Sequence, residues 1–397
     1  MILYKDPIYN FTEIFNQDNG LLIRSNVLDA MGRETDVEPE MRSFPELVDI
    51  GIMSKCHVAN KYCAKFGVDC YQADKIKNED MSLNDFKVII EQCKNKALQV
   101  ALGGNGDPNK HDHFIEMLKC CRKNNIVPNL TTTGINLTDI EIKAMKKYCG
   151  AVAVSMYSKL EQISQEYIET NPDTILAIKN LINENIITNI HYVISTKTID
   201  DAILRLKQNK FPKGVNAVVF LLYKPVGLGN KKYMINNDDP KLELFFELLN
   251  AKKYPFKVGF DTCFSPLINK FLVDYNSKTI EFCEATKFSC YISSDLKMYP
   301  CSFIQKPEYE IDLNNQSIQK GWFSKQFESF RNINNTMCKN CNKKGYCFGG
   351  CRANLNQFSC LQKKKGQNIN PPHRSISSSE HFLGSSKKVF RKCSETF

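Results

Sequence analysis

The sequence predicts an α/β protein whose parallel sheet is followed by a cysteine-rich region, and three observations carry this prediction. Six short apolar segments alternate with amphipathic ones between residues 48 and 225. Each amphipathic segment would return the chain to the same edge of the sheet by a right-handed crossover, which makes successive strands parallel. Eight cysteines then fall between residues 283 and 360, enough for two four-cysteine metal sites.

The expected elements follow one another at short intervals. The expected strands are apolar almost throughout, as when both faces of a sheet are covered; they comprise residues 48–54, 98–104, 127–134, 151–157, 188–195 and 216–225. The expected helices have apolar residues at helical spacing; they comprise residues 82–96, 113–125, 138–149, a stretch ending near 185, 199–210 and 242–253. Periodicity does not separate an open sheet from a barrel, but in both the functional residues gather at the carboxyl ends of the strands.

Composition indicates a globular, cytoplasmic protein with a sizeable core. Of 397 residues, 42% are hydrophobic and 24% are charged. No apolar run approaches the roughly 18 residues that span a membrane, and the first residues lack a signal-peptide pattern. The net charge is +10, but residues 361–397 hold eight Lys or Arg against two Asp or Glu, which is +6 of that total. We therefore expect no nucleic-acid groove on the body of the protein and a disordered tail.

Three cysteines follow the first expected strand. Cys56, Cys63 and Cys70 have the spacing Cys-x6-Cys-x6-Cys, and Tyr71 comes directly after the last. A structural zinc site needs four ligands, and His57 offers a fourth only from an awkward position beside Cys56. Three thiolates on a 4Fe–4S cubane leave one iron open to a small molecule, so this motif predicts a catalytic cluster. The alternative is three unconnected buried cysteines.

The other strand ends carry glycines, hydroxyls and a carboxylate that would meet these cysteines on one rim. The second strand ends in GGNGDP (103–108) and the sixth in KPVGLG (224–229). The third ends in TTTG (131–134), and the fourth ends in Ser155 and Tyr157. Such turns end many parallel strands, so each is a weak signal without the others.

A few further side chains are candidates for chemistry or for packing. Asp261, in GFDTC, and Tyr157 are candidate proton donors or acceptors in the pocket. His191, inside the fifth strand, is interpreted as a satisfied core or rim histidine. The cysteines on or at the ends of predicted helices are more typical of packing than of metal binding; they are Cys93, Cys120, Cys121 and Cys149.

The rear cysteines form two groups in the sequence. The first group is Cys283, Cys290 and Cys301. The second has the spacing Cys-x2-Cys-x5-Cys-x3-Cys and is followed by one more thiol; it comprises Cys338, Cys341, Cys347, Cys351 and then Cys360. Thiolates select zinc or iron–sulfur clusters, and zinc is the alternative for the second group.

Together these motifs resemble radical S-adenosylmethionine (radical SAM) enzymes with a C-terminal SPASM domain, over residues 46 to 360. The family's front motif is Cys-x3-Cys-x2-Cys with an aromatic residue after it; the spacing here is wider, but Tyr71 and the place after the first strand agree. The turn with Gly104, Gly106 and Asp107 resembles the family's Gly-Gly-Glu-Pro turn, which meets the amino group of S-adenosylmethionine. The resemblance implies a partial (β/α)6 barrel and further cofactor contacts from Ser155 and Gly227.

The resemblance also assigns the rear cysteines to two auxiliary 4Fe–4S clusters. Cys283 and Cys301 match the first pair of the SPASM pattern, with Leu296 where glycine is usual. One implied ligand set is Cys283, Cys290, Cys301 and Cys351. The other is Cys338, Cys341, Cys347 and Cys360, with Cys393 as the alternative to the last. The implied organisation is an N-terminal extension (1–45), a radical SAM core (46–235), a bridging region (236–282), a SPASM-like iron–sulfur domain (283–362) and a disordered basic tail (363–397).

The resemblance implies reductive cleavage of S-adenosylmethionine to a 5′-deoxyadenosyl radical, which abstracts a hydrogen atom from the substrate. The first hypothesis for that substrate is a ribosomal peptide or protein. A small molecule or cofactor precursor is the second, and a non-catalytic iron–sulfur or zinc scaffold is the third. An external electron donor such as flavodoxin or ferredoxin is the expected partner, and neither a membrane nor a nucleic acid is expected.

Overall fold

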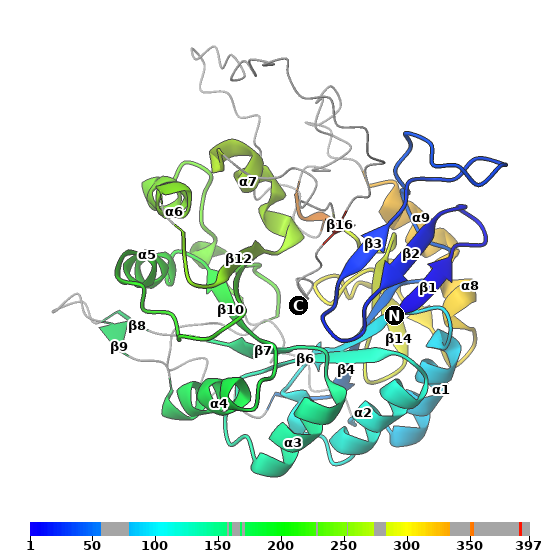
Figure 1. Cartoon of the computed structure of the whole chain (residues 1–397), viewed down its shortest axis with the longest axis horizontal. Coiled ribbons are helices and arrows are strands. Elements are labelled where there is room, and N and C mark those ends of the chain that lie inside the picture. The colour runs from blue at the N-terminus through cyan, green and yellow to red at the C-terminus, as the bar shows by residue number, and fades with distance from the viewer. Residues whose placement is uncertain are drawn as a thin grey trace.

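The computed structural model describes residues 1–56, 79–156, 171–227, 229–251, 253–273, 283–333 and 350–352, with the strand segments 159–160, 167–168 and 389–390. Its centre is a sheet with the strand order β12-β11-β10-β7-β6-β5-β4-β13-β14-β15. The six expected parallel strands are all present (Figure 1); they are β4 (Leu47–Met53), β5 (Gln99–Gly104), β6 (Val127–Thr132), β7 (Val152–Ser155), β10 (Thr188–Ile194) and β11 (Ala217–Leu222). The predicted α/β class with a parallel sheet is therefore confirmed.

The sheet continues beyond the six expected strands on both sides. β12 (Lys257–Phe260) adds a parallel strand beside β11. On the other side β13 (Ser289–Ile292) pairs parallel with β4, and β14 (Lys297–Tyr299) and β15 (Ile311–Asp312) follow antiparallel. The rear cysteine-rich region therefore shares one sheet with the core, and within the described residues this sheet is open, with β12 and β15 at its edges.

Helices cover the outer side of the curved sheet (Figure 1); they are α1 (Leu83–Cys93), α2 (Phe114–Lys123), α3 (Asp139–Tyr148), α4 (Pro172–Asn183), α5 (Ile199–Gln208) and α6 (Pro240–Ala251). Polar side chains start two of the expected helices: Ser82 accepts a hydrogen bond from the Asp85 amide, and Thr138 forms a capping box with Glu141. Each such cap contributes about 1 kcal/mol. Among the described residues no helix is long and apolar enough to cross a membrane.

One expected helical stretch differs from the prediction. Between β7 and α4, the described segments β8 (Lys159–Leu160) and β9 (Tyr167–Ile168) pair antiparallel. The helix begins only at Pro172, because Asn171 caps it and proline fits its first turn but lacks the amide that a longer helix would need. The expectation of helix after the fourth strand is therefore wrong at residues 159–160 and 167–168.

The two faces of the parallel sheet differ in chemistry. Side chains alternate between the faces of a strand, and Val48, Ile50 and Ile52 of β4 join the core formed with α1. The residues between them point to the inner face, away from the helices. Along the central strands this inner face carries small or polar side chains: Asp49, Gly51, Ala101, Gly103, Thr131, Ala153, Ser155 and His191. Beside Gly51 the Tyr291 side chain occupies the space that a larger residue of β4 would need.

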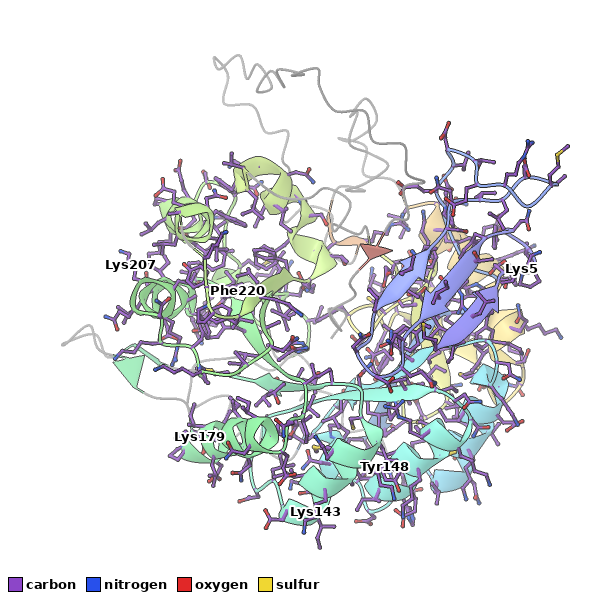
Figure 2. The ribbon with its side chains drawn as sticks, in the orientation of Figure 1. Lys5, Lys143, Tyr148, Lys179, Lys207 and Phe220 are labelled. Carbon is purple, nitrogen blue, oxygen red and sulfur yellow. The ribbon has the colours of Figure 1, made fainter. Side chains whose placement is uncertain are left out.

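Aromatic side chains fill the outer core between β11 and the helices. Figure 2 shows Phe220 inside the molecule, whereas Lys143, Lys179 and Lys207 lie on the exposed side of their helices. The Phe220 ring meets the Phe245 ring edge-on, with their centroids 4.9 Å apart. Edge-to-face pairs of this kind contribute about 0.5–1.5 kcal/mol beyond burial.

A small antiparallel sheet packs beneath the amino-terminal ends of the barrel strands. It consists of β1 (Ile2–Lys5), β2 (Thr12–Phe15) and β3 (Leu22–Arg24), and β16 (Val389–Phe390) pairs with β3. Its buried side chains Phe15 and Leu22 contact Leu98, directly before β5, and Val127, the first residue of β6. The N-terminal extension therefore covers the floor of the barrel. Of the tail expected to be disordered, only β16 is among the described residues.

Candidate active site and thiol cluster

The front rim begins where β4 ends. Cys56 lies three residues after Met53, the last residue of this strand, as the sequence predicts. The Ser54 amide donates to the Asp80 carboxylate at 2.6 Å, and the Met81 amide donates to the Ile52 carbonyl at 2.9 Å. These bonds tie both ends of the cysteine-bearing segment to the strand. His57, Cys63, Cys70 and Tyr71 lie outside the described residues.

The glycine-rich turn after β5 packs directly on the start of that segment. Gly104 has φ +98°, and a Cβ added to it would lie 2.6 Å from the Gly51 Cα. A Cβ on Gly106 would lie 2.4 Å from the Lys55 carbonyl oxygen. Both positions therefore exclude any side chain, because the two backbones approach too closely. The structure brings the predicted turn and the first predicted cysteine together.

Asp107 is directed at the next strand end. Its Oδ1 accepts from the Thr133 amide at 2.9 Å, and its Oδ2 accepts from the Thr133 hydroxyl. Burial raises the pKa of Asp107, and the bonds from Thr133 lower it in part. Each carboxylate oxygen still has an acceptor site. The GGNGDP and TTTG turns thus meet on the rim as expected.

The inner face of the barrel holds buried polar side chains. Among the described residues, Thr131 Oγ1 and His191 Nε2 are buried without a hydrogen-bond partner. Burial lowers the pKa of His191 to about 3 and raises the pKa of Asp49 to about 7. Ser155 lies opposite His191 in the β7–β10 register. The interpretation of His191 as a satisfied histidine is therefore wrong, because its Nε2 has no hydrogen-bond partner among the described residues. The sequence feature that could have indicated a polar inner face is the polar residue at every second position of these buried strands.

The last strand ends are arranged differently. Gly227 lies exposed with φ +59°, in a turn that closes on itself through the Tyr223 hydroxyl, which accepts from the Asn230 amide at 2.7 Å. Asp261 follows β12 and accepts from the Lys224 ammonium at 2.7 Å. Tyr157, the other candidate for proton transfer, lies outside the described residues.

Four thiols gather beyond β12, and one of them was not predicted. Cys263 lies in a single turn of 3-10 helix (Thr262–Phe264), and its thiol hydrogen-bonds with that of Cys351. Cys283 and Cys301 pack in one apolar cluster, and burial, with a smaller contribution from Cys283, raises the pKa of Cys301 to about 12. The sequence signal for Cys263 was its place two residues after Asp261, at the end of a strand.

The structure places Cys290 elsewhere. It lies in β13 opposite Val48, so its side chain faces the helices, where it belongs to the main core with Cys93. This position does not fit the expectation that Cys290 shares a cluster with Cys283 and Cys301. Spacing alone could not show which face of β13 it would occupy. Cys338, Cys341, Cys347, Cys360 and Cys393 lie outside the described residues.

Two backbone positions shape the thiol group. Gly350, with φ +86°, precedes Cys351, and a Cβ on it would lie 2.8 Å from Pro266 Cγ in α7 (Ser265–Phe271). This close approach brings Cys351 to Cys263. Leu296, which stands where the SPASM pattern has glycine, adopts φ +60° in the turn between β13 and β14. The glycine-like conformation is therefore kept although the residue is not glycine.

The thiol group also has buried cations beside it. The Lys224 side chain is 2% exposed; burial lowers the pKa of its ammonium, but the Asp261 carboxylate, with smaller contributions from Cys263 and Cys351, raises this pKa well above its ordinary value. Arg352 is buried next to Cys283, and its guanidinium donates to the Phe330 carbonyl, at the end of α9 (Lys325–Arg331), at 3.1 Å. Burial raises the pKa of the Cys283 thiol, and the Arg352 guanidinium lowers it in part; a neighbouring cation favours the thiolate, which is the form that binds metal.

No three side chains of His, Cys, Asp or Glu in the described ranges converge tightly enough to hold one metal ion. A cubane cluster binds each thiolate at a different iron. Its ligands therefore lie further apart than those of a single ion. The donor set of four thiols with flanking cations fits an iron–sulfur cluster better than a lone zinc ion.

The fold and the site together define a partial α/β barrel with a cysteine-rich region on its rim. The family SPASM, described as an iron-sulfur cluster-binding domain, matches residues 283–342. This match confirms the predicted SPASM region. No curated protein sequence matches the chain.

Solved structures of similar fold cover most of the chain. Streptococcus suis SuiB bound to S-adenosylmethionine has a TM-score of 0.62 at 17% identity, covering 79% of this chain and 75% of that chain. SuiB bound to its precursor peptide SuiA has a TM-score of 0.61 at 17% identity, covering 79% and 73%. Native anSMEcpe with bound AdoMet has a TM-score of 0.56 at 17% identity, covering 78% and 90%. These likenesses show that the chain has the fold of those proteins.

Proposed function

We propose that this chain is a radical SAM enzyme that abstracts a hydrogen atom from a peptide or protein substrate. One observation carries the proposal: Cys56 and the GGNGDP turn meet at the carboxyl ends of the neighbouring strands β4 and β5. Its fold is similar to that of SuiB and anSMEcpe, each of which has been solved with S-adenosylmethionine bound. In folds of this kind ligands bind at that end of the strands.

The front site would be held by Cys56, Cys63 and Cys70. When bound there, a 4Fe–4S cluster with one open iron supplies the electron that cleaves the sulfonium C–S bond of S-adenosylmethionine. Asp107 would orient the amino group of that cofactor with its remaining acceptor capacity. Thr131 and His191 offer buried polar atoms to whatever occupies the barrel. The helices and the N-terminal sheet close the outer side and the floor, which limits the access of water.

The rear site would be held by Cys263, Cys283, Cys301 and Cys351, with Cys263 in place of Cys290. The buried cations Lys224 and Arg352 support this assignment, because buried thiolates need compensating charge. For the remaining auxiliary cluster the proposal keeps the ligands expected from the sequence: Cys338, Cys341, Cys347 and Cys360.

A peptide substrate is favoured by two structural relatives. SuiB has been solved with precursor peptide SuiA, and anSMEcpe with the Cp18Cys peptide. We further propose flavodoxin or ferredoxin as the electron donor, because reduction of the front cluster needs an electron from outside the chain. The free thiols Cys93, Cys121, Cys263 and Cys351 support a reducing, cytoplasmic compartment.

The test is an anaerobic assay of the reconstituted chain. Three 4Fe–4S clusters predict about twelve irons per chain, and dithionite with S-adenosylmethionine should yield 5′-deoxyadenosine, detected by mass spectrometry. Replacing Cys56, Cys63 and Cys70 with alanine should remove about four irons and all 5′-deoxyadenosine. Cys120→Ala, on the helical layer, is the matched control and should keep both. Bound zinc in place of iron, or cleavage that survives the triple replacement, overturns the proposal.

The rear ligand set is tested by comparing the iron content of two single variants. Cys263→Ala should lower the iron content by about one cluster, whereas Cys290→Ala should leave it unchanged. The reverse result would restore Cys290 as the ligand.

A further inference from the structure

A buried ion pair joins the barrel rim to the rear thiols. Lys224 follows β11, and its ammonium donates to Asp261 Oδ2 at 2.7 Å and to the Leu222 carbonyl at 3.0 Å. Asp261 Oδ2 also accepts from the Leu222 amide at 3.2 Å. The lysine side chain is 2% exposed and that of Asp261 is 16% exposed. These bonds hold the ammonium at one place on the rim.

That place lies beside residues that flank two of the four thiols, Cys263 and Cys301. Asp261 comes two residues before Cys263, whose thiol hydrogen-bonds with that of Cys351. The Lys224 ammonium also lies 4.3 Å from the centre of the Phe303 ring, two residues after Cys301. Lys224 therefore contacts two residues, Asp261 and Phe303, that each lie two positions from a proposed cluster ligand.

A fixed charge at this point has a defined consequence for a bound cluster. Four thiolates on a 4Fe–4S core with two positive charges give a net charge of about −2, which reduction by one electron makes about −3. A nearby cation stabilises the more negative, reduced form more strongly, and burial weakens screening by water and salt. The potential of such a cluster is set by charge, hydrogen bonds and exposure.

We propose that the Lys224 ammonium, held in place by Asp261, raises the reduction potential of the auxiliary cluster bound by Cys263, Cys283, Cys301 and Cys351. The inference rests on the rear ligand set of the proposed function. Lys224 acts through the cluster and is a tuning residue, not a catalytic one. Asp261 has the opposite effect on the potential, since its charge is negative.

An alternative role for the pair is purely structural. Lys224 would then only neutralise Asp261, and replacing either residue would loosen the rim without a directed change in potential. The two accounts differ in sign. Charge tuning predicts that loss of Lys224 lowers the potential and loss of the Asp261 charge raises it, whereas loosening moves both variants the same way or neither.

The experiment is a redox titration of the reconstituted full chain, followed by electron paramagnetic resonance. All variants carry alanine at Cys56, Cys63 and Cys70, so that the front cluster does not contribute. Adding Cys301→Ala identifies the signal of the rear cluster and should remove about four irons. The measured variants are Lys224→Met, Lys224→Arg and Asp261→Asn, with Lys197→Met as an exposed control on the same rim.

At the midpoint potential of the parent chain, Lys224→Met should lower the reduced-to-oxidised ratio of the rear cluster at least tenfold, which is about 59 mV for one electron. Asp261→Asn should raise that ratio, while Lys224→Arg and Lys197→Met should leave it near the parent value. If Lys224→Met fails to fold, the upward shift of Asp261→Asn still decides the matter.

The failures are distinguishable. If Cys301→Ala removes no iron and no signal, the proposed ligand set is wrong and this inference fails with it. If Cys301→Ala removes the cluster but Lys224→Met and Asp261→Asn leave the potential unchanged or shift it in the same direction, the ligand set stands and the role of Lys224 is overturned.

Discussion

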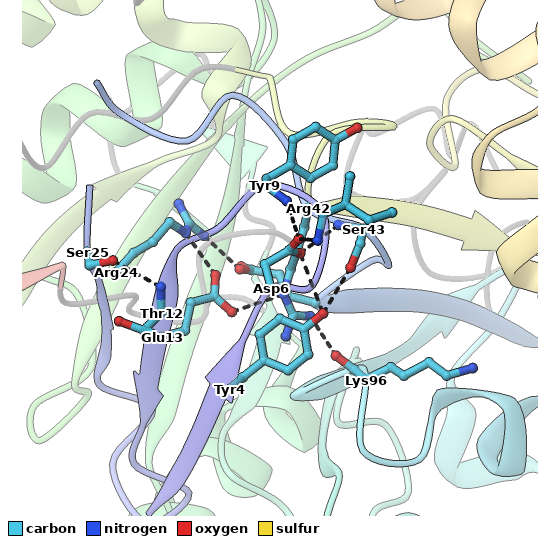
Figure 3. A network of polar contacts seen from close by, with 12 residues as sticks. Tyr4, Asp6, Tyr9, Thr12, Glu13, Arg24, Ser25, Arg42, Ser43 and Lys96 are labelled. Carbon is cyan, nitrogen blue, oxygen red and sulfur yellow. Dashed lines mark hydrogen bonds and ion pairs between the residues drawn. The ribbon is translucent and has the colours of Figure 1, made fainter. Parts of the chain in front are cut away.

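Two buried groups of charges in this chain are built on opposite principles. The first, which we call the N-terminal charge cluster, consists of Glu13, Arg24, Arg42 and Glu46 (Figure 3). Arg24 contacts Glu13 at 2.8 Å and Glu46 at 2.6 Å, and Arg42 contacts Glu13 at 3.0 Å. Two cations face two carboxylates, so this cluster is balanced within itself.

The second group is the Lys224–Asp261 pair, whose surroundings differ. It has one cation, one carboxylate and thiols nearby. If two of these thiols become thiolates, the local charge is no longer balanced by the pair itself. A closed cluster fixes structure, whereas a group beside neutral thiols can accept further negative charge. The comparison teaches that the partners of a buried charge, more than its burial, indicate its role.

The N-terminal charge cluster connects three parts of the molecule. Arg42 donates to the Lys96 carbonyl before β5 at 2.6 Å. The Arg42 guanidinium carbon also lies over the Tyr4 ring of β1, 3.5 Å from the ring centre. The Trp322 indole, in α8 (Ile318–Trp322), donates to the Arg42 carbonyl at 2.8 Å. The N-terminal sheet, the barrel and the rear region are therefore fixed to one another here.

The largest effect is expected from Arg42→Met. This change leaves Glu13 buried, 0% exposed, with one cation fewer, and should lower the free energy of unfolding by about 3–5 kcal/mol. The measurement is urea unfolding of the iron-free chain. Arg33→Met is the matched control, because the Arg33–Asp29 pair is exposed and such pairs contribute at most about 1 kcal/mol. Equal losses from both variants would contradict a structural role for the cluster.

Asp49 shows what happens to a buried carboxyl group without a cation. Burial raises its pKa to about 7, so the folded chain holds a proton that the unfolded chain, with an ordinary pKa of about 4, has released. The contribution of this group to stability is present at low pH and is lost as the pH rises from about 4 to about 7. From pH 5 to pH 8 the loss should be about 2–3 kcal/mol.

Asp49→Asn isolates that contribution, because asparagine resembles the protonated acid at every pH. The difference in unfolding free energy between the parent chain and Asp49→Asn should therefore change between pH 5 and pH 8 by the same amount. A difference that does not vary with pH would show that Asp49 is charged in the folded chain.

A smaller loss is expected from Lys224→Met in the iron-free chain. The Asp261 side chain is 16% exposed and can bind water when the ammonium is removed, so the loss should be about 1–2 kcal/mol. The double variant Lys224→Met/Asp261→Asn should recover part of it, since no unpaired charge remains. A loss as large as that of Arg42→Met would remove the distinction between the two groups.

The smallest free-energy effects are expected at two glycines with positive φ, one in each region. Gly32 has φ +78° and open space around a Cβ, whereas Gly350 has φ +86° and a Cβ there would lie 2.8 Å from Pro266. Gly32→Ala should cost about 1 kcal/mol through backbone strain, and Gly350→Ala should cost somewhat more, because its Cβ would also displace Pro266. Only Gly350→Ala should also lower the iron content, because it displaces Cys351. Full iron loading of Gly350→Ala would contradict the placement of that thiol.

Much of the barrel was predictable because its signals are local. The expected strand 98–104 corresponds to β5 (Gln99–Gly104), and the helix expected over 138–149 corresponds to α3 (Asp139–Tyr148) with its cap at Thr138. Apolar runs and capping residues act on their own neighbours in sequence. The antiparallel pair β8–β9 was missed because two-residue strands have too little pattern to be recognised.

The sequence by itself determined the order of strands and helices, the position of Cys56 and the glycine-rich turn at strand ends, and the presence of a cysteine-rich SPASM region. Only the tertiary structure decided that Cys263 meets Cys351, that Cys290 faces the helices, and that Lys224 and Asp261 form a pair beside the thiols. Spacing along one strand fixes which residues share a face. Which strand lies alongside, and in what register, depends on contacts between residues far apart in sequence, and those contacts decide which side chains meet.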